Sequence, residues 1–221
     1  MRLLCKVLVY LGLPILVLGC IPLKPSGYYL RDGKVFYFVN NVFEDHENQV
    51  SDVEFRSFRI LENKVYASDN LNVYWKGQRI RGANSDSFKA LKDDFSTDKA
   101  NVYYQNIVIL GAAPTTFQVL QSPSMVERSQ WGRDAKDVYF RGKAINACDP
   151  TTFSPLEDQW SRDSKCVYTN YTKKVPEIDA TTFSGINSFC AKDKNGFWST
   201  LIGEYPSSKT AIPVDEKRCK R

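Results

Sequence analysis

Short apolar blocks recur along this chain about every thirty residues, and each block stands at the same distance from an Asp. The Asp is followed four residues later by two apolar residues, the second of which is always aromatic. The six aspartates lie at intervals of 37, 29, 36, 29 and 30 residues: Asp32, Asp69, Asp98, Asp134, Asp163 and Asp193. Such a period is typical of solenoids, propellers and other arrays. The pattern therefore predicts a repeat protein with six copies of one unit, in which the aspartates open turns.

Residues 131–153 show what one copy is expected to contain. Runs rich in β-branched and aromatic residues near 131–133, 138–140 and 143–145 are bounded by Asp and Gly, which predicts strands joined by turns. Asp suits the first turn because its carboxylate accepts hydrogen bonds from backbone N–H groups just after it. The second turn, eight positions after the Asp, needs a residue that tolerates positive φ. Four copies supply one there: Gly77, Gly142, Asn40 and Asn106.

A different segment follows the third strand. It reads Asp-Pro-Thr-Thr-Phe at residues 149–153, and related segments stand at 84–88, 113–117 and 179–183. Asp or Asn as an N-cap, with Pro as the first helical residue, favours a single helical turn. We expect the Phe to fix this turn to the core.

These elements predict a mainly β fold. We expect antiparallel three-stranded units with one-turn helices, stacked as an open repeat array over residues 28–205, and a C-terminal tail at 206–221. The last copy loses the pattern and is interpreted as a polar cap. The alternative is closure into a six-bladed propeller. It is disfavoured because a unit of about 30 residues is shorter than the roughly 40–45 of a four-stranded blade.

The amino terminus has the pattern of a secretory signal peptide. Arg2 and Lys6 flank the start of an apolar run at 7–18, and the small residue Gly19 precedes Cys20. This run is about a dozen residues long, whereas a transmembrane helix needs about 20. The Gly19-Cys20 pair resembles the lipobox of bacterial lipoproteins. That resemblance implies a signal peptide at 1–19, acylation of Cys20 and a short tether at 20–27.

Acylation at Cys20 also implies a location. Several acyl chains give stable membrane attachment. In a Gram-negative cell, many lipoproteins retained in the inner membrane carry Asp after the acylated Cys, where this chain has Ile21. We therefore expect an outer-membrane lipoprotein that faces the periplasm. Without the signal peptide, 28 basic residues stand against 25 acidic ones. This balance does not indicate a nucleic-acid partner.

Four cysteines remain for pairing in the mature chain: Cys148, Cys166, Cys190 and Cys219. An even number in an oxidising compartment is consistent with two disulfides, for which three connectivities exist. We expect Cys148 to pair with Cys166 and Cys190 with Cys219, because each pairing joins neighbours in the sequence. A zinc site is disfavoured, since there is no close Cys pair and the single His, His46, lies in a different copy.

Residues 98–104 (Asp-Lys-Ala-Asn-Val-Tyr-Tyr) and 193–195 (Asp-Lys-Asn) resemble the signature of the bacterial DKNYY repeat family. Its members repeat Asp-Lys-Asn, then Val-Tyr-Tyr, a Gly-containing turn and an Asp-Pro-x-Thr-Phe segment. The resemblance covers roughly residues 28–200, although the copies at Asp69 and Asp163 lack the second-position Lys. It implies an envelope-facing module, often secreted or lipidated, without an established activity. It brings no catalytic residues.

The sequence gives little support for a catalytic site or a metal site. A calcium array of turn aspartates is disfavoured, because lysines occupy the same turns and no loop ends in a bidentate Glu. A Ser-His-Asp triad would use His46, but the chain has no Gly-x-Ser-x-Gly elbow and His46 lies in a polar stretch. We expect no metal, no cofactor and no catalysis. The alternative is a hydrolase of cell wall or glycan that uses a carboxylate pair.

An acyl anchor, a repeated rigid surface and no active-site motif are typical of an interaction protein. We expect a non-catalytic envelope module that is attached to the membrane through Cys20 and binds another envelope protein or a cell-envelope polymer. A narrower hypothesis is a periplasmic immunity protein that neutralises a toxin.

Overall fold

The computed structural model describes residues 25–40, 45–62, 64–121, 123, 129–156, 159–200 and 211–219. The expected signal peptide, Cys20 and tether residues 20–24 lie outside this described part. The chain divides into two compact units, unit 1 (residues 1–79) and unit 2 (residues 80–221). Within the described residues, the strands form six small antiparallel sheets, none of which closes into a barrel. The expected mainly β repeat fold is therefore confirmed.

Unit 1 contains two sheets. The first is the meander β1 (Gly27–Arg31), β2 (Lys34–Asn40) and β3 (Asp45–Gln49). A 3₁₀ helix, η1 (Phe55–Ser57), leads into the second sheet. That sheet has the order β4-β5-β6-β7, with β4 (Arg59–Ile60), β5 (Tyr66–Ser68), β6 (Val73–Trp75) and β7 (Gln78–Arg79).

Unit 2 contains four sheets, each a four-stranded antiparallel meander in chain order or its reverse. The first sheet contains β8 (Lys89–Ala90), β9 (Phe95–Thr97), β10 (Val102–Tyr104) and β11 (Ile107–Val108). The second contains β12 (Gln118–Val119), β13 (Trp131–Arg133), β14 (Val138–Phe140) and β15 (Lys143–Ala144). The third is β16 (Ser154–Pro155), β17 (Ser161–Arg162), β18 (Val167–Thr169), β19 (Lys173–Lys174). The fourth is β20 (Ser184–Asn187), β21 (Cys190–Asp193), β22 (Gly196–Ser199), β23 (Ile212–Val214), followed by helix α1 (Glu216–Cys219).

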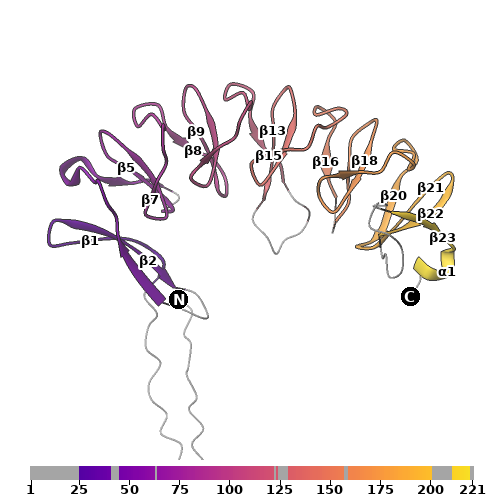
Figure 1. Cartoon of the computed structure of the whole chain (residues 1–221), viewed down its shortest axis with the longest axis horizontal. Helices are drawn as coiled ribbons and strands as arrows, with labels where there is room; N and C mark the ends of the chain where they lie inside the picture. Colours follow the sequence, from indigo (N-terminus) through magenta and orange to yellow (C-terminus); the bar gives the residue numbers. More distant parts are fainter. Residues whose placement is uncertain are drawn as a thin grey trace, which may run out of the picture. The chain divides into compact units, whose positions relative to one another are not determined.

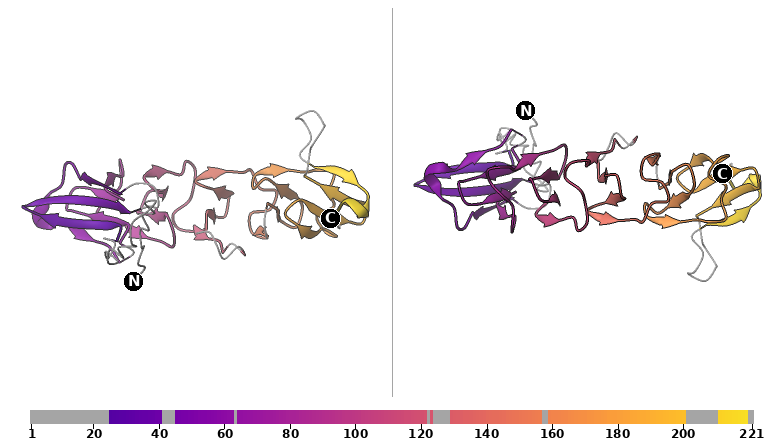
Figure 2. Two further views of the ribbon diagram at one scale, coloured as in Figure 1. Left: turned by 90° about the horizontal axis from the view of Figure 1, so that it is seen from below. Right: turned by 90° about the horizontal axis from the view of Figure 1, so that it is seen from above.

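Within unit 2 the four sheets follow one another in chain order, with the first and last at opposite ends of the unit (Figure 1, Figure 2). Unit 2 is therefore an open stack of sheets and not a closed ring. This arrangement agrees with the expected open array for these four copies.

The prediction of three strands in each copy is wrong for most copies, because five of the six sheets formed by the described residues have four strands. The additional strand is the two- to four-residue segment that follows the Phe of the inter-sheet turn, such as Lys89–Ala90 or Ser154–Pro155. Such short segments with a Lys or a Pro carry no strand pattern in the sequence. Their pairing is set by the longer neighbouring strand, as in Lys89 opposite Thr97.

The expected one-turn helices are present in unit 2 as isolated hydrogen-bonded turns. The Thr116 N–H donates to the Ala113 carbonyl (3.2 Å), and the Thr152 N–H donates to the Asp149 carbonyl (3.3 Å). Each turn closes over three residues and then extends into a strand, so no further helical hydrogen bond forms. Only the turn at η1 in unit 1 reaches 3₁₀ geometry among the described inter-sheet segments.

The turns between the third and fourth strands require positive φ, as expected at Gly77 and Gly142. The same expectation for Asn40 is wrong, because Asn40 is the last residue of strand β2 and does not have positive φ. Gly77 and Gly142 have φ of 79° and 76°, and the residues before them, Lys76 and Arg141, also lie in the left-handed region. Two successive positive φ values are typical of a two-residue hairpin turn. In the copy of Asp98 the positive φ falls on Gln105, one residue before the expected Asn106.

The core of unit 2 is built between successive sheets. Val102 and Ile109 of one sheet cluster with Tyr139 of the next, and Val138 and Ile145 cluster with Tyr168 of the sheet after that. These motif tyrosines are almost fully buried. A single sheet of this size cannot bury its apolar face alone, so each copy is stabilised by its neighbours.

Candidate functional site

The motif Asp is the centre of a hydrogen-bonded cluster, as Asp98 shows. Its Oδ1 accepts the N–H groups of Ala100 (2.8 Å) and Asn101 (2.7 Å), which closes the turn between β9 and β10. Its Oδ2 accepts the N–H of Asn84 (2.9 Å) in the preceding inter-sheet segment and the hydroxyl of Tyr103 (2.7 Å). One carboxylate therefore fixes its own turn, the preceding segment and the motif tyrosine.

The same set of contacts recurs in the other copies. Three further motif aspartates accept two N–H groups from their own turn, one N–H from the preceding segment and one tyrosine hydroxyl: Asp69, Asp134 and Asp163. In the last copy the tyrosine is replaced by Trp198, whose indole N–H donates to Asp193 Oδ1 (2.9 Å). The Asp193 Oδ2 still accepts the Asp179 N–H (2.7 Å).

A hydroxyl side chain completes each cluster. The Ser or Thr directly before the inter-sheet Phe accepts the N–H of the residue that follows the motif Asp. The five acceptor–donor pairs are Ser57 with Asn70, Ser87 with Lys99, Thr116 with Ala135, Thr152 with Ser164 and Thr182 with Lys194, at 3.0 to 3.3 Å. This role of the hydroxyl was not predicted from the sequence. Its signal is the Ser-Phe or Thr-Phe pair present in each of these segments.

These hydrogen bonds favour the ionised carboxyl in four of the motif aspartates: Asp69, Asp98, Asp134 and Asp193. Burial by itself raises the pKa of Asp98, but the hydrogen bonds from Asn84, Tyr103, Ala100 and Asn101 outweigh it and lower the pKa below 3.8. The pKa values of Asp69, Asp134 and Asp193 are lowered for the same reasons. The pKa of Tyr103 is raised, first by burial and then by its bond to the Asp98 carboxylate. The tyrosine therefore remains a neutral donor.

Protein donors fill the acceptor sites of the motif Asp, as Asp98 shows. A carboxylate offers about four lone-pair sites, and in Asp98 four protein donors occupy them. A hard cation would have to displace these donors. Among the described residues, no group of three or more His, Cys, Asp or Glu side chains has the geometry to hold a metal ion.

Asp32 differs from the other five turn aspartates. It lies in the two-residue hairpin turn between β1 and β2, where Asp32 and Gly33 both have positive φ (52° and 70°), and its side chain is exposed. The Asp-Gly pair is a common sequence for this turn. The first copy thus uses its Asp for backbone conformation at a simple hairpin.

A family model, described as the DKNYY family, matches residues 66–200. The chain belongs to the DKNYY family. The matched range includes the five copies in which the motif Asp is the centre of the hydrogen-bonded cluster. The DKNYY signature thus coincides with the residues that hold each turn to its neighbouring segment. Neither the curated proteins nor the solved structures give a match to this chain.

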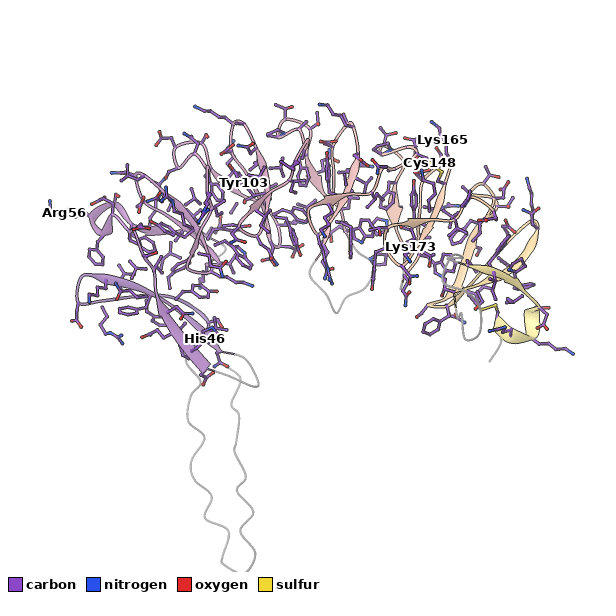
Figure 3. All side chains as sticks on the ribbon, viewed as in Figure 1. His46, Arg56, Tyr103, Cys148, Lys165 and Lys173 are labelled. Carbon is purple, nitrogen blue, oxygen red and sulfur yellow. A yellow bond between two sulfur atoms is a disulfide. The ribbon has the colours of Figure 1, made fainter. Side chains whose placement is uncertain are left out.

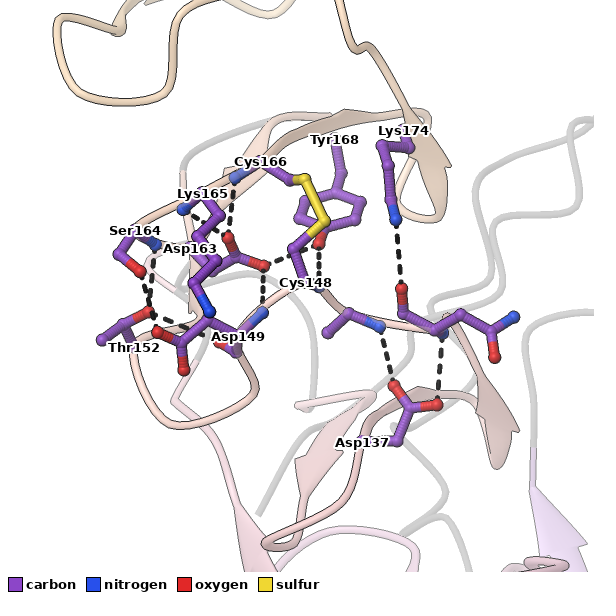
Figure 4. Close-up of a disulfide and its surroundings, with 12 residues drawn as sticks. Asp137, Cys148, Asp149, Thr152, Asp163, Ser164, Lys165, Cys166, Tyr168 and Lys174 are labelled. Carbon is purple, nitrogen blue, oxygen red and sulfur yellow. Dashed lines mark hydrogen bonds between the residues drawn. A yellow bond between two sulfur atoms is a disulfide. The ribbon is translucent and has the colours of Figure 1, made fainter.

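The four expected disulfide cysteines of this DKNYY chain lie in two pairs at disulfide distance. Cys148 and Cys166 have Cα atoms 6.0 Å apart, and Cys190 and Cys219 have Cα atoms 5.6 Å apart. The first pair joins an inter-sheet segment to the Asp163 turn (Figure 4). The second pair joins β21 to α1, so the segment expected to be a tail is attached to the last sheet through β23 and this bond.

The DKNYY turns leave two residues exposed directly after each motif Asp in unit 2. These pairs are 99–100, 135–136, 164–165 and 194–195, and each contains one lysine: Lys99, Lys136, Lys165 and Lys194. We call the surface formed by these four pairs the Asp-turn edge. Figure 3 shows Lys165 on this edge and Lys173, next to a hairpin turn, on the opposite one. The motif residues fix the backbone here, while the exposed pairs differ from copy to copy.

The remaining candidates from the sequence are His46, as the base of a triad, and the carboxyls, as general acids. His46 lies exposed on β3 of unit 1 (Figure 3), which is the wrong environment for the base of a triad. Each described carboxyl whose pKa departs from its ordinary value does so downward: Asp69, Asp98, Asp134, Asp149, Asp179 and Asp193. A general acid needs a raised pKa. In the described part of the chain, no helix has the length and apolar character required to span a bilayer.

Proposed function

We propose that this chain is a non-catalytic binding module of the bacterial cell envelope, held at the membrane by acylation of Cys20. Its partner is another protein of the envelope, and in the narrower form of the proposal that partner is a toxin which the module neutralises. The contact surface is the Asp-turn edge of unit 2.

The observation that carries this proposal is that, within each turn, the motif Asp maintains the fold while the two residues after it are exposed. The motif Asp has its acceptor sites filled by protein donors, so the repeated residues maintain the fold. The two residues after it are exposed in all four turns of unit 2 and vary between copies. Repeat proteins commonly bind their partners through an extended surface to which successive stacked repeats contribute.

Two further observations support an envelope location. The four described cysteines lie in two disulfide-bonded pairs, and structural disulfides persist mainly in oxidising compartments. The Gly19-Cys20 sequence resembles a lipobox. The residue after Cys20 is Ile21 and not Asp, which supports an outer-membrane position facing the periplasm.

The test is capture of partners from an envelope extract by the full-length protein, with mass spectrometry of the retained material. One variant replaces the four edge lysines with Gln: Lys99, Lys136, Lys165 and Lys194. The matched control replaces four exposed lysines outside this edge: Lys92, Lys143, Lys173 and Lys174. Both variants lose the same formal charge, so the loss of non-specific electrostatic binding is comparable; replacement of Lys194 also removes its ion pair with Asp179 (2.7 Å).

We expect a saturable protein partner that the control variant retains and the edge variant loses. Equal retention by both variants would exclude the Asp-turn edge as the contact surface. Recovery of wall fragments that return shortened, with no protein partner, would instead support the hydrolase alternative.

A further inference from the structure

The two disulfides of unit 2 differ in their access to solvent. Cys190 and Cys219 are buried, with 2% and 5% of their surface exposed. Cys148 and Cys166 are only partly buried: Cys166 packs against the core on one side and directly follows the exposed residues 164–165 of the Asp163 turn. Exposed disulfides are the labile ones in thiol–disulfide exchange, because the attacking thiolate must reach a sulfur atom. We propose that Cys148–Cys166 is a thiol-exchange site that a dithiol reductant opens while unit 2 remains folded.

Hydrogen bonds hold the same two segments together beside the disulfide (Figure 4). The Asp149 N–H donates to Asp163 Oδ2 (3.0 Å), and the Cys148 N–H donates to the Tyr168 hydroxyl oxygen (2.8 Å). The Ser164 N–H donates to the Thr152 hydroxyl (3.0 Å), and the Ser164 hydroxyl donates to Asp149 (2.8 Å). Opening the S–S bond leaves all of these contacts in place, so the turn keeps its position.

In other copies, hydrogen bonds of this kind attach the turn to its preceding segment without a disulfide. The turn of Asp98 is attached to its preceding segment by the same contacts, from Asn84 to Asp98 and from Lys99 to Ser87, without a disulfide. The position of Cys166 is occupied by Asn72 in the copy of Asp69, where the side-chain amide donates to the Asp52 carbonyl (3.0 Å). A disulfide at Cys166 therefore adds to a link that the copies otherwise make by hydrogen bonding alone.

The second disulfide has a different position. Cys219 lies in α1, at the end of the segment that supplies β23 to the last sheet. Both of its sulfur atoms lie in the core, where Ala191 and Trp198 are also buried. A reductant reaches this bond only after the C-terminal segment has opened, and such local opening costs free energy. The Cys190–Cys219 bond thus provides an internal reference for reactivity.

The exchange is a two-electron step. One thiolate of the dithiol attacks a sulfur of Cys148–Cys166 and forms a mixed disulfide, while the S–S bond breaks and the other sulfur leaves as a thiolate that takes a proton from water. The second thiol of the reductant then attacks the mixed disulfide. The reductant leaves as its cyclic disulfide, and both cysteines become thiols.

The test uses the full-length oxidised protein and dithiothreitol as the probe, in native buffer. Samples taken at intervals are alkylated with iodoacetamide, and peptide mapping assigns the label to individual cysteines. Circular dichroism of the same samples follows the β structure. We expect Cys148 and Cys166 to be labelled about 100-fold faster than Cys190 and Cys219, because the buried pair needs local opening first. We also expect the β signal to remain unchanged during the fast phase.

Two variants complete the test. The double variant Cys148→Ser and Cys166→Ser should keep the β signal and lose only the fast labelling. The double variant Cys190→Ser and Cys219→Ser should keep the fast labelling of Cys148 and Cys166, even if its C-terminal segment is more readily cleaved by protease. Equal labelling rates for the two pairs in the wild-type protein, or labelling of Cys148 and Cys166 only when the β signal is lost, would overturn the proposal.

Discussion

Replacement of Asp98 with Ala removes the acceptor at the centre of one hydrogen-bonded cluster. Four donors lose their partner: the N–H groups of Ala100, Asn101 and Asn84, and the hydroxyl of Tyr103. The Ala100 and Asn101 groups lie in a surface turn, where water can replace the carboxylate. The Tyr103 side chain is fully buried, and the Asn84 N–H in the preceding segment is partly buried.

The expected loss of stability is about 3 kcal/mol. Leaving a buried donor without an acceptor costs about 1–3 kcal/mol. The buried Tyr103 hydroxyl contributes about 1–3 kcal/mol and the partly buried Asn84 N–H up to the same amount, which gives a range of about 1–6 kcal/mol. The Tyr103 hydroxyl has a second acceptor in the Gly82 carbonyl at 3.4 Å, which places the expected value in the lower half of that range. This is a large fraction of the roughly 5–15 kcal/mol that stabilises a typical domain.

Urea unfolding at neutral pH, followed by circular dichroism, measures this loss as a lower midpoint. The control is Asp86→Ala, which removes an exposed carboxylate from the same copy and should change stability by less than about 0.5 kcal/mol. The wild-type protein should lose stability as the pH falls through the native pKa of Asp98. This pKa lies below the ordinary 3.8, so the stabilisation is present above that value. If Asp98→Ala matches Asp86→Ala in stability, the proposed role of the motif Asp is wrong.

Three further predictions concern packing and pH. Gly132→Ala should destabilise by about 1–3 kcal/mol, because its Cβ would overlap the ring of Phe117; Gly185→Ala, whose Cβ would have no described atom within 4 Å, is the control in the same unfolding assay. Ser161→Ala should leave stability unchanged or raise it by about 1 kcal/mol, because the buried Ser161 hydroxyl has no hydrogen-bond partner among the described residues; a calorimetric melting temperature clearly below wild type would contradict this. In alkaline titrations, the free energy of unfolding should be constant below pH 10 and fall above it. The reason is that the pKa of the core tyrosines is raised in the native state only, by burial and, in the motif copies, by the neighbouring Asp. These tyrosines are Tyr28, Tyr74, Tyr103, Tyr139 and Tyr168. Unfolding that begins well below pH 10 would contradict this assignment.

The repeat pattern in the sequence was sufficient to predict the β repeat fold. The spacing from Asp98 to Tyr103 reappears as the turn, the strand β10 and the buried tyrosine. The cysteine pairs were also predictable, because each joins sequence neighbours. These features depend on short-range spacing, which one sequence displays directly.

Features that depend on contacts between copies were harder to predict. The Asp98 carboxylate was expected to close its own turn, but its bonds to Asn84 and Tyr103 link it to two other elements. The short strand β8 was missed because its pairing with β9 is set by tertiary position and not by its own residues. The exposure of the residue pairs on the Asp-turn edge likewise follows from how the turn is held.

The most direct test of the account is site-specific photo-crosslinking in cells that produce the protein. One variant carries a photoreactive amino acid in place of Lys136 on the Asp-turn edge, and the other carries it in place of Lys143, which is also exposed but lies next to the hairpin turn of the same sheet. Both sites are in one copy, so expression and folding are matched. The account predicts one envelope protein crosslinked from Lys136 and not from Lys143. Crosslinks of equal yield from both positions, or from neither, would contradict it.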